Sequence, residues 1–370
     1  MKAIICGGGT VGHLTPGISI AEIIKKNDKN SKILFVSRAG GTENDVILKS
    51  GFDLQTIKIE PLIHRITLKN FSKIKTMISA LKEAKKILND FSPDVVIGTG
   101  GYVCWPMLRA AQKMKIPTVI HESNLCPGAA TRFLAGKSSK VLLNFRESEK
   151  HFKKKNNLIT VGNPLPDSFS SITRDEARRK LGLTQKDFFI LSFGGSGGAE
   201  KINETVIELM KSYSSQKKEI VHVHASGKRY LDKIKEENPL FVNSGYNGCK
   251  IVPFINNMAL YMKAADTVIS RCGAMTLSEI AHCQTAPILI PSPNVTGNHQ
   301  YKNAKMFTDV GAALMIEESE LNARTLIDAV RYLAMNKGVR EKIKKQLSSF
   351  KCDDTKKNIY SIIEEVIKKS

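Results

Sequence analysis

The sequence is poor in the features that mark several classes of protein. Aromatic residues make up 6% of the chain, with a single tryptophan, and no helix-turn-helix, RNA-recognition or zinc signature is present. The 7 cysteines are odd in number and show no metal-ligand spacing, which indicates reduced thiols in a cytosolic protein. No apolar run approaches membrane-spanning length, and the sequence opens directly on a strand pattern. Neither a transmembrane segment nor a signal peptide is therefore expected.

Acidic residues are also scarce relative to basic ones. The chain has 35 Asp and Glu against 56 Lys and Arg, which gives a net charge of +21 and a pI near 9.6. Such an excess predicts an anionic partner: nucleic acid, an anionic membrane surface or a polyanionic substrate. Because no nucleic-acid signature supports the first, we favour the other two. The 370 residues, 42% hydrophobic and 25% charged, suggest two globular domains with their own cores.

Short apolar runs alternate with helical patterns throughout the chain. The first half is expected to form strands at residues 3–6, 32–37, 54–59, 94–99, 117–122, 140–145 and 158–161. The second half restarts the pattern, with strands expected at 188–193, 221–225, 250–254, 267–270, 287–291 and 312–316. Each half opens with a strand, a glycine loop and a helix. The predicted fold is therefore α/β, with two Rossmann-like doubly wound domains facing a cleft.

The boundary between the halves is predicted at Gly162-Asn163-Pro164, an extended, turn-forming segment. Residues 1–162 are expected to form an N-terminal domain and residues 163–345 a C-terminal domain. The sequence from Leu321 onward is helical and lysine-rich. Its last part, residues 346–370, is expected to form a helix that packs back toward the N-terminal domain.

The stretch from Thr267 to Asn303 carries a strand–helix–strand unit with polar residues where such a unit keeps a ligand. Glu279 lies near the start of an otherwise apolar helix pattern. Asn298, His299 and Gln300 follow the second strand. A carboxylate at such a place can accept hydrogen bonds from a sugar diol, and the amides can bind hydroxyls. The alternative is that Glu279 is an ordinary acidic residue favoured near a helix N-terminus.

The first glycine loop, Gly7 to His13, raises the question of a dinucleotide site. A Rossmann dehydrogenase requires Gly-x-Gly-x-x-Gly and then an acidic residue near the end of the second strand. Here that strand ends in Val36-Ser37-Arg38, and although Arg38 suits a 2′-phosphate, no dehydrogenase constellation follows. We therefore expect the loop to bring backbone N–H groups close to another anion at a helix N-terminus. A tight turn without a ligand is the alternative.

Eight motifs, taken in order, together resemble one enzyme family. They are GGGTVGHLTPG, DVVIGTGGYV, HESNLCPG, VGNP, FGGSGGA, PFINNMA, ISRCGAMTLSEIA and GNHQYKNA, and they run from Gly7 to about Glu317. The sequence is similar to the MurG-type N-acetylglucosaminyltransferases of peptidoglycan synthesis. The resemblance implies the glycosyltransferase type B fold and an inverting transfer of GlcNAc from UDP-GlcNAc, without a cofactor. The implied acceptor is the C4 hydroxyl of the muramoyl sugar in the undecaprenyl-pyrophosphoryl-linked pentapeptide lipid.

Such a transfer needs a base for the acceptor hydroxyl and stabilisation of the departing UDP. His13 is the candidate base, because a near-neutral imidazole suits proton transfer, and Glu122 is the next candidate. The alternative for His13 is to order the loop or to bind an acceptor phosphate. The sequence has no Asp-x-Asp motif, so a metal held by that motif is not indicated. Ser196 and the backbone N–H groups at the next helix start are expected to stabilise the UDP instead.

The resemblance also assigns the contacts with both substrates. Glu279 is implied to hold the ribose hydroxyls, Phe254 and Ile255 to pack on the uracil, and His299 with Gln300 to address the GlcNAc. The implied UDP-GlcNAc site further includes Thr10, Val11, Gly12, His13 and, from the other domain, Asn124. The implied acceptor-phosphate loops contain Gly8, Gly9, Gly100, Gly101 and Tyr102.

The sequence departs from the family pattern at several positions that bear on donor binding, among them Val11, Pro166, Ser123 and Gly197. Val11 stands where the family usually has glycine, which restricts φ in the first loop. Pro166 stands where an arginine normally meets the donor phosphates, so a charge-assisted contact is missing. Because the base, ribose-binding and sugar-binding positions remain, we expect an active enzyme.

The segment from Arg65 to Phe91 has a basic amphipathic pattern. Its apolar residues recur at helical spacing and are surrounded by lysines; they are Leu68, Phe71, Ile74, Met77, Ile78, Leu81 and Leu88. The pattern suits a helix at an anionic membrane surface, with Lys69, Phe71, Lys73 and Lys75 facing lipid. Ile74, Met77, Ile78 and Leu81 are expected to be partly packed. A helix that only covers a sheet is the alternative. The protein is expected to be peripheral, on the cytoplasmic face of the bacterial cell membrane.

Two other functions remain open. One is a type B transferase that uses a UDP-sugar and a different lipid acceptor, and the other is a non-catalytic UDP-sugar-binding protein. An assay with the lipid acceptor separates them. His222 and His224 lie on one face of a strand, as a metal-binding pair would, but no third ligand is near in the sequence. They are expected to be structural, and no metal site is predicted.

Overall fold

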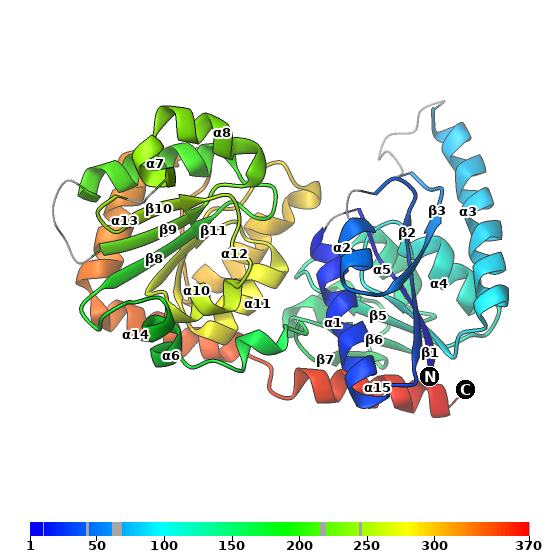
Figure 1. The fold of residues 1–370 in the computed structure, drawn as a ribbon. Helices are drawn as coiled ribbons and strands as arrows, with labels where there is room; N and C mark the ends of the chain where they lie inside the picture. Colours follow the sequence, from blue (N-terminus) through cyan, green and yellow to red (C-terminus); the bar gives the residue numbers. More distant parts are fainter. Residues whose placement is uncertain (10, 42–43, 61–68, 215–219, 244–245, 370) are drawn as a thin grey trace. The chain divides into compact units, whose positions relative to one another are not determined.

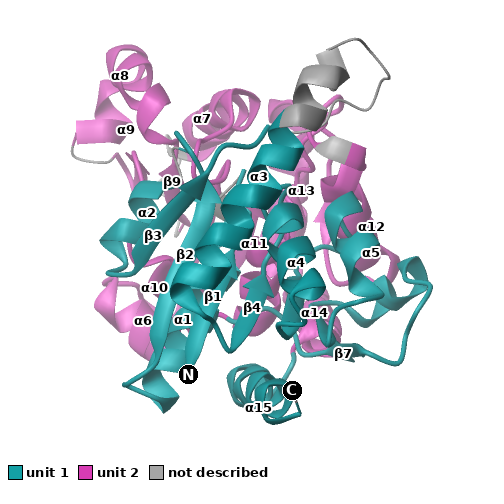
Figure 2. Ribbon diagram, turned by 90° about the vertical axis from the view of Figure 1, so that its right-hand side faces the viewer, with its two compact units in different colours: residues 1–164, 352–370 teal, residues 165–351 magenta. Residues whose placement is uncertain are grey.

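The computed structural model describes residues 1–370 except 10, 42–43, 61–68, 215–219, 244–245 and 370 (Figure 1). The side chains of residues 11, 69–75, 214 and 296 also lie outside the described part. The chain forms two compact units. Unit 1 comprises Met1–Pro164 and Cys352–Ser370, and unit 2 comprises Leu165–Lys351 (Figure 2). The sequence placed these boundaries at residues 162 and 345. Residues up to Lys351 belong to unit 2, and Phe350 stacks there on Phe307 with ring centroids 4.1 Å apart.

Unit 1 is built on a parallel sheet in the order β3-β2-β1-β4-β5-β6-β7. Its strands are β1 (Lys2–Cys6), β2 (Lys32–Arg38), β3 (Asp53–Ile57), β4 (Val95–Gly98), β5 (Thr118–Glu122), β6 (Lys140–Leu143) and β7 (Leu158–Thr160). Its helices are α1 (Val11–Asn27), α2 (Asn44–Lys49), α3 (Lys69–Phe91), α4 (Cys104–Lys113), α5 (Ala129–Ala135) and α15 (Thr355–Lys368), with the 3-10 helix η1 (Arg146–His151). The order of strands reverses between β1 and β4. This is the point at which doubly wound sheets keep their ligands.

Alternate residues of each unit 1 strand face opposite sides of the sheet. Ala3 and Ile5 of β1 pack with residues of α1, α2 and α15, whereas Ile4 and Cys6 pack with residues of α3, α4 and α5. Helix α15 follows unit 2 in the sequence but lies beside α1 (Figure 1). The chain therefore returns to unit 1 at its C-terminal end.

Unit 2 has a second parallel sheet, in the order β10-β9-β8-β11-β12-β13. Its strands are β8 (Phe188–Phe193), β9 (Ile220–Ala225), β10 (Cys249–Val252), β11 (Thr267–Ser270), β12 (Ala286–Leu289) and β13 (Leu314–Met315). Its helices are α6 (Arg174–Lys180), α7 (Glu200–Ser214), α8 (Lys228–Glu237), α9 (Pro239–Asn243), α10 (Met258–Ala264), α11 (Ala274–Cys283), α12 (His299–Asp309), α13 (Ala323–Met335) and α14 (Lys337–Leu347). Short 3-10 helices are η2 (Asp167–Phe169), η3 (Thr296–Asn298) and η4 (Ser348–Phe350). Here the strand order reverses between β8 and β11.

Every strand expected from the sequence is present, with ends that differ by a few residues. The prediction succeeded because buried parallel strands are continuous apolar runs that end in glycine or polar loops. Both sheets are parallel throughout, and the α/β prediction with two Rossmann-like, doubly wound units is confirmed.

Helix α3 covers the sheet with its C-terminal half, where Ala80 and Ala84 are buried. Ile78 is 53% exposed, so the expectation that it is partly packed was wrong. The reason is its place on the helix, because Ile78 shares its stripe with the exposed Lys82 and Lys85, four and seven residues later.

Other expectations for the same helix have mixed outcomes. Met77 and Leu81 are half-buried, as predicted. The expected lipid-facing residues are Lys69, Phe71, Lys73 and Lys75; their side chains, and that of Ile74, lie outside the described residues. Of the residues that the structure describes, none forms a helix long and apolar enough to cross a membrane.

Candidate functional site

The predicted acceptor-phosphate glycines meet at the carboxyl ends of β1 and β4. Gly8 and Gly9 follow β1, and Gly100 and Gly101 follow β4. A Cβ atom on Gly101 would lie 2.0 Å from the Gly8 carbonyl oxygen, and Gly101 has a φ of +84°. Tyr102 lies against Gly9, where an added Cβ would be 3.2 Å from the tyrosine ring. The two loops therefore interlock at the switch point of the unit 1 sheet, and only glycine permits their close approach.

His13 lies in the first turn of α1, held by both loops. Its Nδ1 is 3.1 Å from the Gly8 carbonyl oxygen, and the Thr99 hydroxyl donates to the His13 carbonyl at 2.7 Å. A carbonyl oxygen only accepts hydrogen bonds, so Nδ1 carries the proton and the neutral ring has its lone pair on Nε2. Gly100 packs against the ring, since a Cβ there would lie 2.6 Å from His13 Cδ2. The imidazole is thus fixed in a tautomer that can take up a proton at Nε2.

Glu122 ends β5 and is buried, and its carboxylate is engaged by the loop that follows it. Oε1 accepts from the backbone N–H of Asn124 at 3.0 Å and from the Asn124 side-chain amide at 3.3 Å. Oε2 accepts from the backbone N–H of Gly128 at 3.2 Å. The geometry suits Glu122 to hold Asn124 in place; its assignment as a second candidate base stays a prediction.

The neighbouring His121 is fully buried and its Nε2 donates to the Gly162 carbonyl at 3.1 Å. Burial lowers the pKa of this imidazole to about 4, so the ring is neutral at physiological pH. Two other predicted residues of this unit cannot be placed. Thr10 and the side chain of Val11 lie outside the described residues, whereas Gly12 is exposed within α1.

Unit 2 carries a pocket of about 640 Å³ at the carboxyl ends of its central strands. Its walls are the glycine loop after β8 with the start of α7, Arg229 and Tyr230 after β9, Gly273 and Thr276 after β11, and Gln300. Parallel strands direct their carboxyl ends, and the N-termini of the following helices, to one edge of the sheet. The pocket therefore combines backbone N–H groups at positive helix ends, which favours an anionic ligand.

Two side chains tie the loops around this pocket together. Gln300 Oε1 accepts from the backbone N–H of Ser292 at 2.9 Å and from that of Cys272 at 3.3 Å. Arg271 donates to the Ile290 and Pro291 carbonyls and forms an ion pair with Glu318. Gln300 thus holds the loops after β11 and β12 in register, and Glu318 balances the charge of Arg271.

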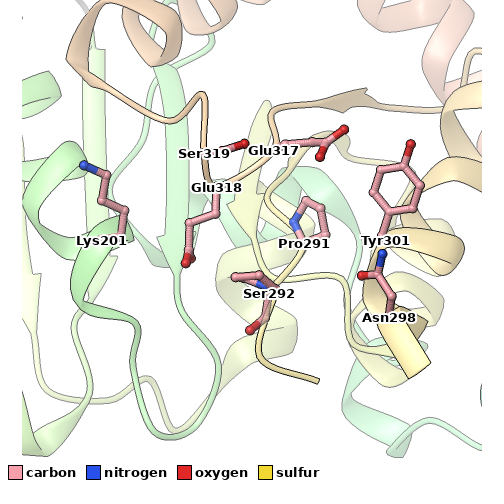
Figure 3. Close-up of a pocket in the computed structure, with 9 residues that line it drawn as sticks. Lys201, Pro291, Ser292, Asn298, Tyr301, Glu317, Glu318 and Ser319 are labelled. Carbon is pink, nitrogen blue, oxygen red and sulfur yellow. The ribbon is translucent and has the colours of Figure 1, made fainter. Parts of the chain in front are cut away.

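A second cavity, of about 480 Å³, adjoins this pocket and shares Lys201, Ser292 and Glu318 with it. Figure 3 shows Lys201 on one side of the cavity and Asn298 with Tyr301 on the other. Its lining combines hydroxyl, amide, ammonium and carboxylate groups with Pro291, Pro293 and the ring of Tyr301. This composition suits a ligand that has both hydrogen-bonding groups and apolar surface.

Of the predicted donor-binding residues in unit 2, Gln300 lines the pocket, and Ser196, Phe254, Ile255, Glu279 and His299 lie elsewhere in that unit. Ser196 is exposed at the tip of the glycine loop, and His299 is the first residue of α12. Phe254 is 48% exposed, and the adjacent Ile255 is buried. The exposed aromatic ring beside a fixed aliphatic residue leaves a surface on which a flat base can pack.

Glu279 lies on α11, one turn after the pocket residue Thr276 and on the same face of the helix. The residue is half-buried, and burial of its carboxyl raises the pKa from 4.5 to about 8. A carboxyl whose pKa is raised in this way is costly to ionise without hydrogen-bond donors, and a bound diol would supply them.

Sequence reasoning missed several residues of this region. Arg229 and Tyr230 follow β9, and the guanidinium lies 4.5 Å from the centroid of the tyrosine ring. Their position after the carboxyl end of a strand was a usable signal, because ligand sites of parallel sheets lie there. The pairing of Arg271 with Glu318 had no such signal, since 47 residues separate them.

Solved structures of other proteins share this fold. A crystal structure of Acinetobacter baumannii MurG aligns with a TM-score of 0.75 at 23% identity, over 98% of this chain and 99% of that chain. A UDP-GlcNAc 2-epimerase from Neisseria meningitidis, bound to UDP-GlcNAc, aligns with a TM-score of 0.65 at 16% identity, over the full length of both chains. At these identities the likeness concerns the fold alone, and that fold is the glycosyltransferase type B fold.

Sequence comparison identifies the family. The N-terminal domain of glycosyltransferase family 28 matches residues 3–143, and its C-terminal domain matches residues 189–359. The chain belongs to glycosyltransferase family 28. It is 37% identical over 368 residues to an Acetivibrio thermocellus enzyme, covering 100% of this chain and 99% of that one. It is 39% identical over 367 residues to one from Thermoanaerobacter sp. strain X514, covering 99% and 100%. Both relatives are UDP-N-acetylglucosamine--N-acetylmuramyl-(pentapeptide) pyrophosphoryl-undecaprenol N-acetylglucosamine transferases.

Proposed function

We propose that this chain transfers N-acetylglucosamine from UDP-GlcNAc to the lipid-linked muramoyl pentapeptide, converting lipid I to lipid II in peptidoglycan synthesis. The observation that carries the proposal is the identity of 37–39% over essentially the whole chain to transferases of that name. Two loop-lined sheet edges, one in each unit, supply a place for each of two anionic substrates.

In unit 1 we assign the acceptor and the proton transfer. The interlocked loops of Gly8, Gly9, Gly100, Gly101 and Tyr102 bind the acceptor pyrophosphate through backbone N–H groups. The Nε2 atom of His13 takes the proton from the muramoyl C4 hydroxyl as its oxygen attacks the anomeric carbon. The bond from that carbon to the UDP oxygen breaks on the opposite face, so the configuration inverts. Asn124, held by Glu122, contacts the transferred sugar.

In unit 2 we assign the donor. The glycine loop with Ser196 and the N-terminus of α7 stabilise the negative charge that develops on the departing UDP. Glu279 accepts hydrogen bonds from the ribose hydroxyls, and Phe254 with Ile255 packs on the uracil. Gln300 and His299 address the GlcNAc. In this scheme the N-terminus of α7 and the N–H groups of the glycine loop stabilise the departing UDP, and no metal ion is needed.

The test is incubation of the protein with labelled UDP-GlcNAc and a short-chain lipid I analogue. We expect one disaccharide with a β-1,4 linkage and one UDP released for each sugar transferred. UDP-GlcNAc binding without turnover would instead make the chain a sugar-nucleotide-binding protein. Turnover with a different lipid alone would make it a transferase of another pathway.

We further propose that the protein works as a peripheral protein at the cytoplasmic face of the bacterial membrane, with helix α3 as its docking element. Ile78 is exposed on the same stripe as Lys82 and Lys85, which are exposed as well. Phe71 precedes Ile78 by seven residues and continues that stripe in the sequence. An exposed stripe that combines an apolar residue with lysines suits an anionic lipid surface.

Replacing Lys69, Lys73 and Lys75 together by glutamate is expected to release the protein from anionic vesicles. Each lysine near such a surface contributes about 1 kcal/mol, an attraction that salt screens. Transfer to a membrane-embedded acceptor should slow, while transfer to a water-soluble acceptor analogue should not. A control with Lys186, Lys235 and Lys250 of unit 2 changed to glutamate makes the same change in net charge. Equal sedimentation of both variants with vesicles would exclude α3 as the docking element.

A further inference from the structure

The core of unit 2 holds a continuous line of polar side chains below the glycine loop. It runs from Tyr213 through His222, Ser192 and His224 to Asn203, and all five residues are buried. Ser192 Oγ lies 2.6 Å from His222 Nε2 and 2.8 Å from His224 Nδ1. Tyr213 bonds to His222 Nδ1, and His224 Nε2 lies 3.0 Å from Asn203 Oδ1. Fully buried positions in a sheet core are usually occupied by apolar residues, so a line of five buried polar side chains calls for an explanation.

The donor and acceptor of each hydrogen bond can be assigned by starting from Asn203, at one end of the line. The Asn203 amide donates to the Ser226 carbonyl at 3.0 Å, so its Oδ1 accepts from His224 Nε2–H. His224 Nδ1 then accepts from the Ser192 hydroxyl, whose oxygen accepts from His222 Nε2–H. His222 Nδ1 accepts in turn from Tyr213. Each hydrogen bond of the line therefore has one donor and one acceptor, all bonds run in the same direction, and both imidazoles are neutral.

Burial keeps both rings in that state. It lowers the pKa of His224 to about 4 and the pKa of His222 well below its ordinary value, with a smaller contribution from the charge of His224. The neutral tautomers, rather than charge, are thus what these residues bring to the protein.

The line joins the elements that form the walls of the 640 Å³ pocket. Ser192 lies on β8 two residues before the glycine loop, and Asn203 lies in the first turn of α7, just after it. His224 pairs in register with Ser192, and the chain then passes through Ser226 and Gly227 into α8, which carries Arg229 and Tyr230 in its first turn. The hydrogen bonds that join Ser192, His224 and Asn203 therefore link the strand before the glycine loop and the helix after it to the β9 side of the pocket, where Arg229 and Tyr230 lie.

The backbone of the glycine loop packs so closely on the Ser226–Gly227 backbone that there is no room for a side chain at Gly198 or Gly227. A Cβ atom on Gly198 would lie 2.1 Å from the Ser226 carbonyl oxygen, which is the atom that accepts from Asn203. A Cβ on Gly227 would lie 2.8 Å from the Cα atom of Gly198. The end of the glycine loop thus rests directly on the Ser226–Gly227 backbone, and the Asn203 amide bonds to the carbonyl at that contact.

We propose that Ser192, His224 and Asn203 are positioning residues for UDP-GlcNAc, which hold the phosphate-facing glycine loop at a fixed distance from the Arg229–Tyr230 wall. This inference rests on the proposed function, because it takes the pocket to be the donor site. Tyr213 and His222 extend the line away from the pocket and support the core.

The test compares two deletions of one buried hydroxyl from the same line, Ser192→Ala next to the glycine loop and Tyr213→Phe at the far end. Both are expected to lower the melting temperature by similar amounts. Ser192→Ala should also weaken UDP binding and raise the KM for UDP-GlcNAc by about 10- to 100-fold, with a smaller change in kcat, because the loop is displaced. Tyr213→Phe should keep UDP affinity within about twofold. The near-isosteric Asn203→Asp, whose carboxylate cannot donate to Ser226, should behave like Ser192→Ala.

The outcomes separate this inference from the proposed function. Wild-type protein that fails to bind UDP in calorimetry overturns the proposed function. If the wild type binds UDP and both Ser192→Ala and Asn203→Asp bind it with unchanged affinity, only the positioning role is overturned. The positioning role is also overturned if Tyr213→Phe loses as much UDP affinity as Ser192→Ala while both variants lose the same amount of melting temperature. If Asn203→Asp does not fold, the comparison of the two hydroxyl deletions decides.

Discussion

Replacing His13 by alanine is expected to lower kcat by roughly 10²–10⁴-fold, the usual scale of general base catalysis. This corresponds to about 2.7–5.5 kcal/mol of transition-state stabilisation. The structure gives the reason, because the bond from Nδ1 to the Gly8 carbonyl fixes the tautomer whose lone pair is on Nε2. UDP affinity should change little, since the donor site that we propose lies in unit 2.

A second variant separates the base from a role in ordering the loop. His13→Asn can keep a donor near the position of Nδ1, and so the contact with Gly8, but has no atom at the position of Nε2. We expect it to be as slow as His13→Ala. If His13→Asn instead retains the wild-type kcat, the imidazole acts by holding the glycine loops. If kcat persists in His13→Ala and the KM for the acceptor rises, His13 binds the lipid phosphate.

The fold was predictable because its signals are local. Each strand is a short apolar run followed by glycine or a polar loop, and this pattern is visible without any tertiary contact. Ile78 shows the limit of such signals. Its spacing fits an apolar helix stripe, yet the sheet contacts a neighbouring stripe that contains Ala80 and Ala84. Which stripe a long helix buries depends on its partner, and the sequence of the helix alone does not contain this information.

The positions of candidate site residues in the fold were predictable where they lie in a single loop or directly after a strand. The glycine loops, His13 and Gln300 were all identified, and the structure brings each of them to a carboxyl edge of a sheet. The contacts between distant segments were not. No sequence pattern joins Asn203 to Ser226 or Gly101 to Gly8, because such pairs arise only when strands far apart in the chain become neighbours.

Glu122 shows the same limit for a titratable group. The sequence places a carboxylate at the end of a strand, which is where a catalytic base is often found. It does not show that three N–H groups from the next six residues converge on that carboxylate. Residue type alone therefore does not show which partners such a carboxylate has, and its role as a second candidate base stays a prediction.

Replacing Glu279 by alanine is expected to raise the dissociation constant of UDP by one to several orders of magnitude. Two charge-assisted hydrogen bonds to the ribose, each worth roughly 1.5–3 kcal/mol, would be lost. The protein should stay folded, because the change removes a costly buried carboxyl. Glu208→Ala, at an exposed position of α7 that forms a surface ion pair with Lys211, is the matched control and should bind UDP normally.

The pH dependence of UDP binding provides the second arm of this test. With a pKa of about 8, the Glu279 carboxyl is mostly protonated at neutral pH in the absence of ligand. The ribose hydroxyls need the ionised form as acceptor, so binding must release a proton. Affinity should therefore rise by about tenfold for each pH unit up to about pH 8 and then level off. The UDP phosphates also titrate, so the measured quantity is the difference between wild type and Glu279→Gln, which lacks the ionisable group. Identical pH profiles for the two proteins, with equal affinity, would remove Glu279 from the ribose site.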